Sequence, residues 1–253
     1  MLFRSLFQQF AAQGGWQMSG WAHHPYTKKL PPTVRDTNPD SITLANITDL
    51  ETLLDTVANT THLIPAGKPI FNTEFGYETK PPDPFNGIPI ATQSAWINVA
   101  DEIAYRDPRV LSTTQFLYQD QPPLRNHPRG SRAYWFAYQS GLRYPSGKAK
   151  PALLAYAFPF NLTPLPPGPG GAGQYDAWGQ LRFRPNFNTT DIVGLQWRPQ
   201  GGTTWTTEAT VPVVNDVGYF DTPLNAAGRG TWRAVWLVQN QALVGSREIA
   251  VGY

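Results

Sequence analysis

Residues 68–77 read Lys-Pro-Ile-Phe-Asn-Thr-Glu-Phe-Gly-Tyr, and this stretch decides the fold. Its apolar and aromatic run is typical of a buried strand, and a helical stripe over residues 43–59 lies just before it. Glu74 stands where the strand ends. The C-terminal end of a buried strand in a parallel sheet is where functional side chains gather. Glu74 is therefore the first candidate for chemistry.

The same alternation of strands and helices extends along the first 160 residues. The patterns predict strands over residues 16–22, 68–73 and 110–118, and helices over residues 1–13, 43–59, 91–105 and 131–139. Strands that alternate with helices of this length indicate parallel βα units, so this part of the chain belongs to the α/β class.

The composition changes after residue 160. Residues 161–174 are rich in Pro and Gly, as a linker is. Beyond them the helical stripes disappear, and short alternating segments are separated by turn signals such as residues 200–202. Strands at this spacing predict a small antiparallel β-sandwich of the immunoglobulin or fibronectin kind over residues 175–253.

Composition excludes several classes of function. The 20 basic and 18 acidic residues are mixed along the chain, so we expect no nucleic-acid partner. Without cysteine there is no disulfide, thiolate metal site or cysteine nucleophile. We predict no cofactor. We also predict no metal site, because the adjacent residues His23 and His24 point opposite ways on an extended chain. Residues 1–13 lack the apolar stretch of a signal peptide, and no long apolar run predicts a membrane span.

The stretch around Glu74, with the His-Pro-Tyr loop before it and the aromatic strand after it, resembles the last three strands of clan A retaining glycoside hydrolases, the cellulase- and xylosidase-like superfamily. That resemblance covers about residues 1–160 and implies strands six to eight of a (β/α)8 barrel. It also implies that Glu74, in a Thr-Glu-Phe-Gly context, is the catalytic nucleophile. The sugar-binding residues that it implies are His23, His24, Tyr26, Tyr77, Gln115, Tyr118 and Asp120.

Two features depart from the family pattern. Many relatives have a tryptophan on the last strand, where this chain offers Phe116 and Tyr118. The family's acid/base is a Glu that follows an Asn on the fourth strand, and the sequence holds no Asn-Glu pair. Retention needs a second, protonated carboxyl group about 5 Å from the nucleophile. Glu78, Asp83 and Asp120 are nearby carboxyl groups, but none of them matches the motif.

A (β/α)8 barrel takes about 250 residues, whereas the part before the linker has three clear strands. Either the chain is a fragment of a longer glycosidase that supplies the acid/base elsewhere, or its half-barrel covers an open sheet edge by self-association. The function expected is hydrolysis of O-glycosidic bonds in carbohydrates, outside the cell by analogy with relatives. The alternative is a non-catalytic carbohydrate-binding or cell-surface interaction protein with a vestigial half-barrel.

Overall fold

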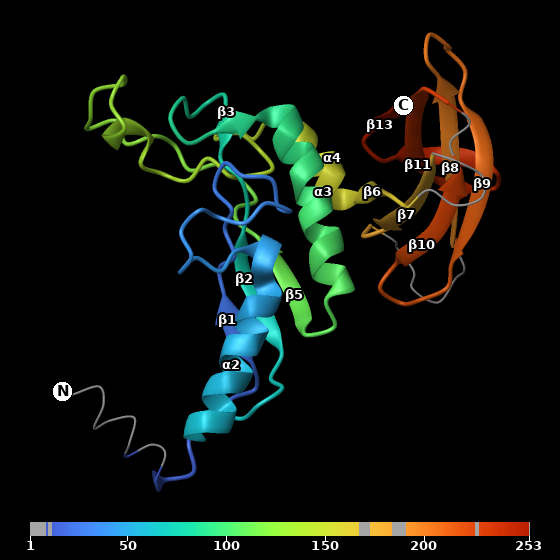
Figure 1. Ribbon diagram of the computed structural model, residues 1–253. Coiled ribbons are helices and arrows are strands. Elements are labelled where there is room, and N and C mark those ends of the chain that lie inside the picture. Colours follow the sequence, from blue (N-terminus) through green and yellow to red (C-terminus); the bar gives the residue numbers. More distant parts are fainter. Residues whose placement is uncertain (1–8, 10–11, 167–172, 184–190, 226–227, 253) are drawn as a thin grey trace. The chain divides into compact units, whose positions relative to one another are not determined.

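The three predicted parallel strands form one open sheet. In the computed structural model they are β1 (Trp21–His23), β2 (Ile70–Phe75) and β5 (Val110–Gln115), in the order β1-β2-β5. Trp21 is paired with Ile70, and Ile70 with Val110, so the strands start level with one another. The prediction of parallel βα units is confirmed for this sheet, and β1 and β5 are its edges (Figure 1).

The structure describes residues 9, 12–166, 173–183, 191–225 and 228–252. The helix predicted over residues 1–13 therefore lies almost wholly outside the described residues. The chain forms two compact units. The first unit is Met1–Pro89 with Val99–Pro145, and the second unit is Ile90–Asn98 with Ser146–Tyr253.

Helix α2 (Ile47–Thr61) follows a short 3-10 turn, η1 (Leu44–Asn46), and covers one face of the parallel sheet. Leu50, Leu54 and Ala58 recur every four residues and are buried against Ile70, which is 0% exposed. Burying each leucine contributes about 1.5–3 kcal/mol. The helix ends at His62, which adopts the left-handed conformation with φ of 55°. The apolar stripe of residues 43–59 thus has the role that its period predicts.

Helix α3 (Ile90–Arg106) confirms the prediction over residues 91–105, but the helix predicted over residues 131–139 is wrong. Only Ala133–Trp135 form a 3-10 turn, η2. The backbone instead bonds to an earlier part of the same loop: the N–H of Leu124 donates to the carbonyl of Tyr134 (2.8 Å), and that of Gln121 to the carbonyl of Tyr138 (2.9 Å). These bonds replace the i to i−4 ladder that a helix requires. The loop lies beside the two-stranded sheet of β3 (Thr79–Lys80) and β4 (Ile88–Pro89), because Thr79 N–H donates to the Gln139 carbonyl.

The second unit has two antiparallel sheets. One has the order β10 (Tyr219–Asn225), β7 (Gln174–Gln180), β6 (Phe160–Pro164). The other joins, in order, β12 (Gln241–Gly245), β11 (Gly230–Val238), β8 (Asp191–Pro199) and β9 (Thr206–Val213), and β13 (Ile249–Val251) also pairs with β11. Both sheets contribute to a single core, in which Phe160 and Phe220 of the first meet Leu195 and Trp232 of the second.

Three elements of the second unit were not predicted from the sequence, and one of them is β12. Helix α4 (Pro151–Ala157) is short, with a proline at its first turn. Residues 160–164 were read as linker or its border, yet they form β6 and pair with β7. The large apolar residues at every second position, Phe158, Phe160 and Leu162, are the signal for a strand, and the surrounding prolines obscure it.

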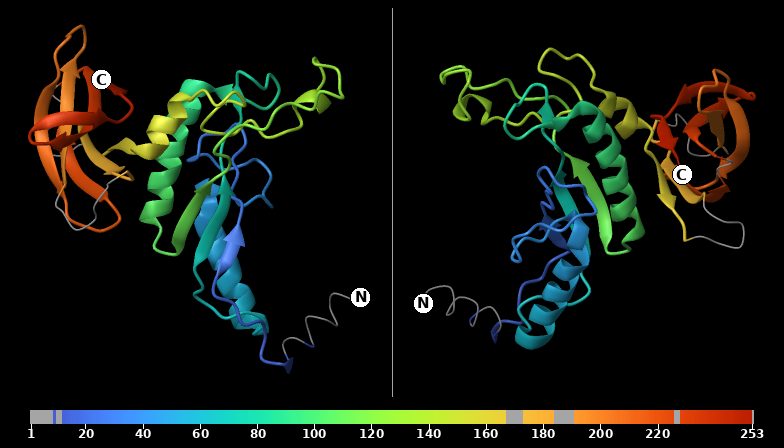
Figure 2. Two further views of the ribbon diagram at one scale, coloured as in Figure 1. Left: turned by 180° about the vertical axis from the view of Figure 1, so that it is seen from behind. Right: turned by 45° about the horizontal axis from the view of Figure 1, so that its top comes forward.

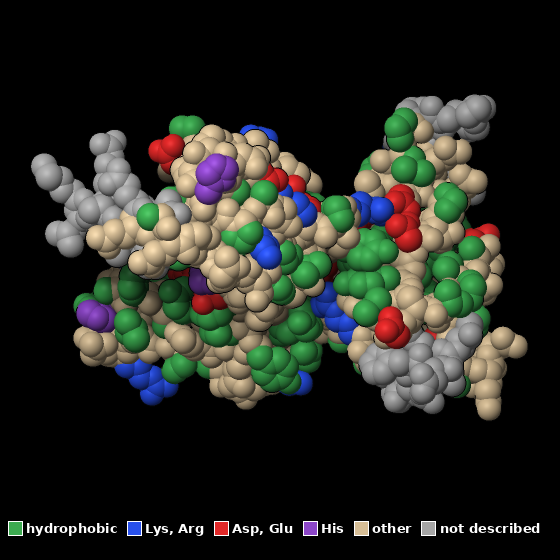
Figure 3. Space-filling view, turned by 90° about the horizontal axis from the view of Figure 1, so that it is seen from below, with side chains coloured by type: hydrophobic (Ala, Val, Ile, Leu, Met, Phe, Trp, Pro, Cys, Tyr) green, Lys and Arg blue, Asp and Glu red, His purple; other side chains and the backbone are tan. Residues whose placement is uncertain are grey.

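Taken as a whole, the described residues form a mixed α/β fold with several sheets, none of which closes into a barrel. Charged side chains of both signs are interspersed over the face in Figure 3. Among the described helices, none has the length and apolar content needed to cross a membrane.

Candidate functional site

A cleft of about 710 Å³ lies at the carboxyl ends of the three parallel strands. The loops that follow β1, β2 and β5 gather at this end of the sheet (Figure 2). The loop after β1 contributes residues 26–30 and Asp36, the segment after β2 contributes Gly76, Glu78 and Asn86, and the segment after β5 contributes residues 135–138 and Ser140. A cleft at this edge is where α/β sheets bind ligands.

Glu74 lies on β2 at the border of this cleft. The Tyr26 hydroxyl donates a hydrogen bond to Glu74 Oε2 (3.1 Å), and His24 Nδ1 lies 3.5 Å from the same oxygen. Burial, followed by the hydrogen bond with Glu74, raises the pKa of Tyr26 well above its usual range. Tyr26 therefore keeps its proton and remains a donor to the carboxylate. The Glu74 side chain is 34% exposed, so a ligand can reach it.

His23 points away from Glu74. Its Nε2 lies 3.0 Å from the Ile42 carbonyl, and burial lowers its pKa below 6.5. His23 therefore ties β1 to the loop before α2. Of the two adjacent histidines, the structure brings His24 to the carboxylate and gives His23 a structural contact.

Tyr77 does not face the cleft. It is 1% exposed, and its hydroxyl accepts a hydrogen bond from Thr27 Oγ1 (2.6 Å) and donates to the Leu30 carbonyl (3.3 Å). A ring this deeply buried cannot stack on a sugar in this conformation. Tyr77 instead holds the loop after β1 in place, including Thr27 and Leu30 of the cleft wall.

The three residues predicted on or after the last strand organise the segment after it. Gln115 Nε2 donates to the Ser140 carbonyl (2.9 Å), and Asp120 Oδ1 accepts from the Gly141 N–H (2.8 Å). The Tyr118 hydroxyl accepts from Arg143 Nε (2.9 Å), the Arg143 guanidinium lies 5.5 Å from the centre of the Tyr118 ring, and Tyr118 is 60% exposed. Within the described residues, the cleft wall includes none of the three. Gln115 nevertheless positions Ser140, which does line it.

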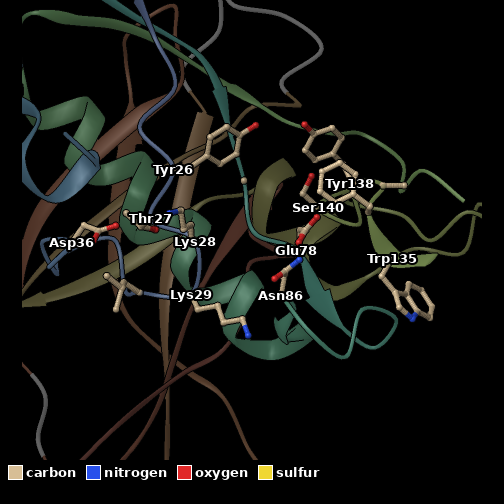
Figure 4. Close-up of a pocket in the computed structure, with 14 residues that line it drawn as sticks. Tyr26, Thr27, Lys28, Lys29, Asp36, Glu78, Asn86, Trp135, Tyr138 and Ser140 are labelled. Atoms are coloured by element: carbon tan, nitrogen blue, oxygen red, sulfur yellow. The ribbon is translucent and has the colours of Figure 1, made fainter. Parts of the chain in front are cut away.

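Glu78 is an ionisable residue of the cleft that is not among the site residues predicted from the sequence. It lines the cleft between Asn86 and Ser140 (Figure 4). Burial, followed by the negative charge of Asp83 and a hydrogen bond to it, raises the pKa of Glu78 to about 7. A carboxyl group with this pKa exchanges protons near neutral pH, as a general acid or base does.

The cleft also has an aromatic rim, which the sequence does not predict because residues 131–139 have the pattern of a helix. Residues 135–138 line the cleft, and Phe136 is 82% exposed and Tyr138 53% exposed. The hydroxyl groups of Tyr26 and Tyr138 face each other across the opening (Figure 4). The run Ala-Tyr-Trp-Phe-Ala-Tyr over residues 133–138 was a readable signal, since exposed aromatic groups in a loop are unusual unless they bind something.

Gly76 allows the ends of β2 and β5 to meet. A Cβ atom at this position would lie 2.2 Å from the Phe116 carbonyl oxygen, which is backbone and cannot move aside. The peptide bond Phe116–Leu117, which comes just after β5, is cis. Glycine is therefore required where the chain passes from Glu74 to Glu78.

Metal-ligating side chains do not cluster in the part of the chain that the structure describes: no group of three or more His, Asp or Glu residues there could hold an ion. The chemistry that the cleft can support with its own groups is proton transfer, nucleophilic attack by a carboxylate, and stacking on aromatic rings.

No protein-family model matches the chain, and no curated protein matches it. Its fold is similar to that of the family 39 glycoside hydrolase from the gut symbiont Bacteroides cellulosilyticus WH2, with a TM-score of 0.44 and 13% identity over 82% of this chain and 43% of that one. A β-glucuronidase of Bacteroides uniformis gives a TM-score of 0.38 and 12% identity over 92% and 26% of the two chains.

The superoxide reductase from Nanoarchaeum equitans gives a TM-score of 0.27 and 13% identity over 36% of this chain and 90% of that one. The chain spans less than half the length of the family 39 structure. At these TM-scores the likeness to glycoside hydrolases is a coarse one of fold.

Proposed function

We propose that this chain is a glycosidase-like protein in which Glu74 is the nucleophile of a retaining, two-carboxylate mechanism on O-glycosides. The observation that carries the proposal is the hydrogen bond from Tyr26 to Glu74 Oε2 at the carboxyl end of β2. A hydrogen bond to a charged acceptor contributes about 1.5–3 kcal/mol and fixes the orientation of the carboxylate. The second oxygen is left to attack the anomeric carbon of a sugar.

The cleft beside Glu74 suits a sugar ring. Tyr26, Tyr138 and the exposed ring of Phe136 offer apolar faces, and Asn86, Ser140 and Lys28 offer polar groups. Pyranose rings have this same combination of an apolar face and hydroxyl edges. Small-molecule sites are typically clefts of about 300–1,000 Å³ with a few convergent polar groups.

Covalent labelling tests the role of Glu74. The 2-deoxy-2-fluoro-β-glycosyl fluorides of gluco, xylo, galacto and glucurono configuration would be incubated with the 253-residue protein. Glu74 attacks C1, fluoride leaves without needing a proton, and the fluorine at C2 slows hydrolysis of the ester. We expect a mass increase of one fluorosugar on the peptide that contains Glu74 with at least one configuration.

Glu74→Gln is the control and should not be labelled, since an amide is not a nucleophile of this kind. Labelling elsewhere, or none with any sugar, would refute Glu74 as the nucleophile. Binding of the same sugars without labelling would instead favour the second candidate, a non-catalytic carbohydrate-binding protein. The observation that favours this candidate is the exposed aromatic rim of residues 135–138.

We further propose that the parallel sheet corresponds to the last three strands of a barrel and the second unit to an accessory β-sandwich of the immunoglobulin or fibronectin kind. In this proposal the edge strands β1 and β5 are covered either by further strands of a longer protein or by self-association, and the protein acts outside the cell. Light scattering of the purified chain distinguishes the two ways of covering the edges, because only self-association gives a dimer.

A further inference from the structure

Asp83 is a fully buried carboxylate on the loop between β3 and β4. It is 0% exposed, and both of its oxygens are occupied by backbone donors. Oδ1 accepts from the Phe85 N–H (2.7 Å), and Oδ2 accepts from the Asn86 N–H (3.1 Å). Hydrogen bonds from N–H groups stabilise the charged form of a carboxyl group. Asp83 is therefore held as the anion.

The half-buried carboxyl group of Glu78 meets this anion and is hydrogen-bonded to it. Two carboxyl groups in contact do not both ionise, so the pair holds one proton, and the backbone donors to Asp83 leave that proton on Glu78. Burial, Asp83 and the more distant Asp120 raise the pKa of Glu78 to about 7, and a hydrogen bond from the Gln139 backbone opposes them.

Other charged and titratable groups face the same space. Lys28, Lys29 and Asp36 line the cleft on the loop after β1, and the hydroxyl groups of Tyr26 and Tyr138 stand above Glu78. Tyr26 joins the two halves of the site, because its ring lines the cleft with Glu78 while its hydroxyl donates to Glu74. Glu74 and Glu78 are four residues apart on one segment, which can span no more than about 14 Å, and Tyr26 is the residue that contacts Glu74 and lines the cleft with Glu78.

We infer that Glu78 is the proton donor of the cleft, acting together with Glu74, and that Asp83 is the positioning residue that keeps this proton on Glu78. The inference rests on the proposed function and adds to it the second carboxyl group, which no Asn-Glu pair in the sequence supplies. When two carboxyl groups have different environments, their pKa values differ, and the group with the higher pKa can act as the acid while the other acts as the nucleophile.

Glu78 transfers its proton to the glycosidic oxygen while the bond from that oxygen to C1 breaks, and a bond forms between C1 and an oxygen of Glu74. The alcohol leaves. Water then attacks C1, returns a proton to Glu78 and releases Glu74 as the carboxylate, so that neither an oxidant nor a metal is consumed.

Leaving groups of different acidity test the role of Glu78. Both substrates carry the sugar configuration that labels Glu74. The 2,4-dinitrophenolate leaving group departs without a proton, whereas the phenolate leaving group of the phenyl glycoside must be protonated as it departs. In Glu78→Ala and Glu78→Gln we expect kcat on the phenyl glycoside to fall about 10²–10⁴-fold. Formation of the glycosyl-enzyme from the dinitrophenyl glycoside should change little, and azide should restore its turnover in Glu78→Ala by giving the glycosyl azide.

Glu208→Gln, an exposed residue of β9 (Thr206–Val213), is the matched control and should leave both rates unchanged. Asp83→Asn should move the alkaline limb of kcat/KM for the phenyl glycoside to lower pH, because removing the negative neighbour lowers the pKa of Glu78. Thermal unfolding of each variant verifies that it is folded.

The outcomes separate the two proposals. Absence of labelling at Glu74 refutes the proposed nucleophile and the acid with it. Labelling at Glu74 with no hydrolysis of the phenyl glycoside by the wild-type chain overturns the inference about Glu78 alone. Equal losses in the rate of glycosyl-enzyme formation from both glycosides in folded Glu78→Gln would also overturn it, since a residue that acts only through structure does not discriminate between leaving groups.

Discussion

At the scale of single residues, the hydrogen bond from Tyr26 to Glu74 is the contact most open to test. Tyr26→Phe removes the donor and keeps the ring stacked near Phe75. A hydrogen bond to a charged group contributes about 1.5–3 kcal/mol. Losing that contribution in the transition state should make labelling of Glu74 about 10–100-fold slower than in the wild type. The rate is followed by intact-protein mass spectrometry with the fluorosugar.

Tyr105→Phe is the matched control for that substitution, because Tyr105 is a 41% exposed residue of helix α3. It should label at the wild-type rate. An unchanged rate in Tyr26→Phe would mean that the hydroxyl does not orient Glu74 for attack.

Single residues also show what the sequence can and cannot disclose. Glu74 could be placed at a strand end because strand periodicity and the position of the carboxylate are both local properties. The burial of Tyr77 and the contact of Glu78 with Asp83 could not be predicted from the sequence, because they depend on how the loop of residues 79–89 folds back on itself. The sequence correctly predicts that the side chains of the adjacent residues His23 and His24 point in different directions. It does not predict which of them contacts Glu74, because that depends on the register between β1 and β2.

At the scale of elements, a second pair of carboxyl groups joins helix α2 to the end of helix α3. Asp107 Oδ1 accepts from the Arg109 N–H (2.9 Å), while Glu51 hydrogen-bonds to Asp107 and keeps the proton. Burial, then Asp107, raises the pKa of Glu51 from 4.5 to about 7. Because folding raises the pKa of Glu51, this residue stabilises the folded state. The stabilisation is fully present below pH 4.5 and is lost as the pH rises through about 7.

Glu51→Gln keeps a hydrogen-bond donor but does not titrate. The difference in melting temperature, Glu51→Gln minus wild type, should therefore increase as the pH rises from about 4.5 to above 7. Differential scanning calorimetry at several pH values measures it. Asp107→Asn should reduce the same pH dependence, because burial still raises the pKa of Glu51 there, and a constant difference in Glu51→Gln would show that the pair shares no proton.

Helices and strands were predictable from the sequence where the apolar residues recur with a single clear period. Helices α2 and α3 have clear apolar stripes, and the sequence placed them within a few residues. The aromatic loop of residues 131–139 has apolar residues at helical spacing, but its backbone groups bond to residues 121–124 instead, and a contact between distant segments leaves no trace in periodicity.

At the scale of the whole molecule, each unit has its own core. Ile70 is buried under helix α2 in the first unit, and Leu195 lies between the two antiparallel sheets of the second, both at 0% exposure. Leu195→Ala and Ile70→Ala should each cost about 2–5 kcal/mol. We expect two calorimetric transitions, one lowered by each substitution, with Glu74 still labelled in Leu195→Ala.

Leu111→Ala, at a residue 61% exposed on β5, should shift neither transition. One transition that both core substitutions lower together would contradict separate unfolding of the units.

Helix α3 gives its first nine residues, Ile90–Asn98, to the second unit, whose remainder starts at Ser146. Asn98 donates to the Ala155 carbonyl (2.8 Å) and accepts from Arg247 Nε (2.8 Å), and burial lowers the pKa of that guanidinium to about 10. A coding segment that began at Ser146 would leave this buried guanidinium with the Asn161 side chain (3.3 Å) but without that of Asn98. A gene cassette for the second unit would therefore have to encode residues 90–98 as well, in order to keep the hydrogen bonds of Asn98.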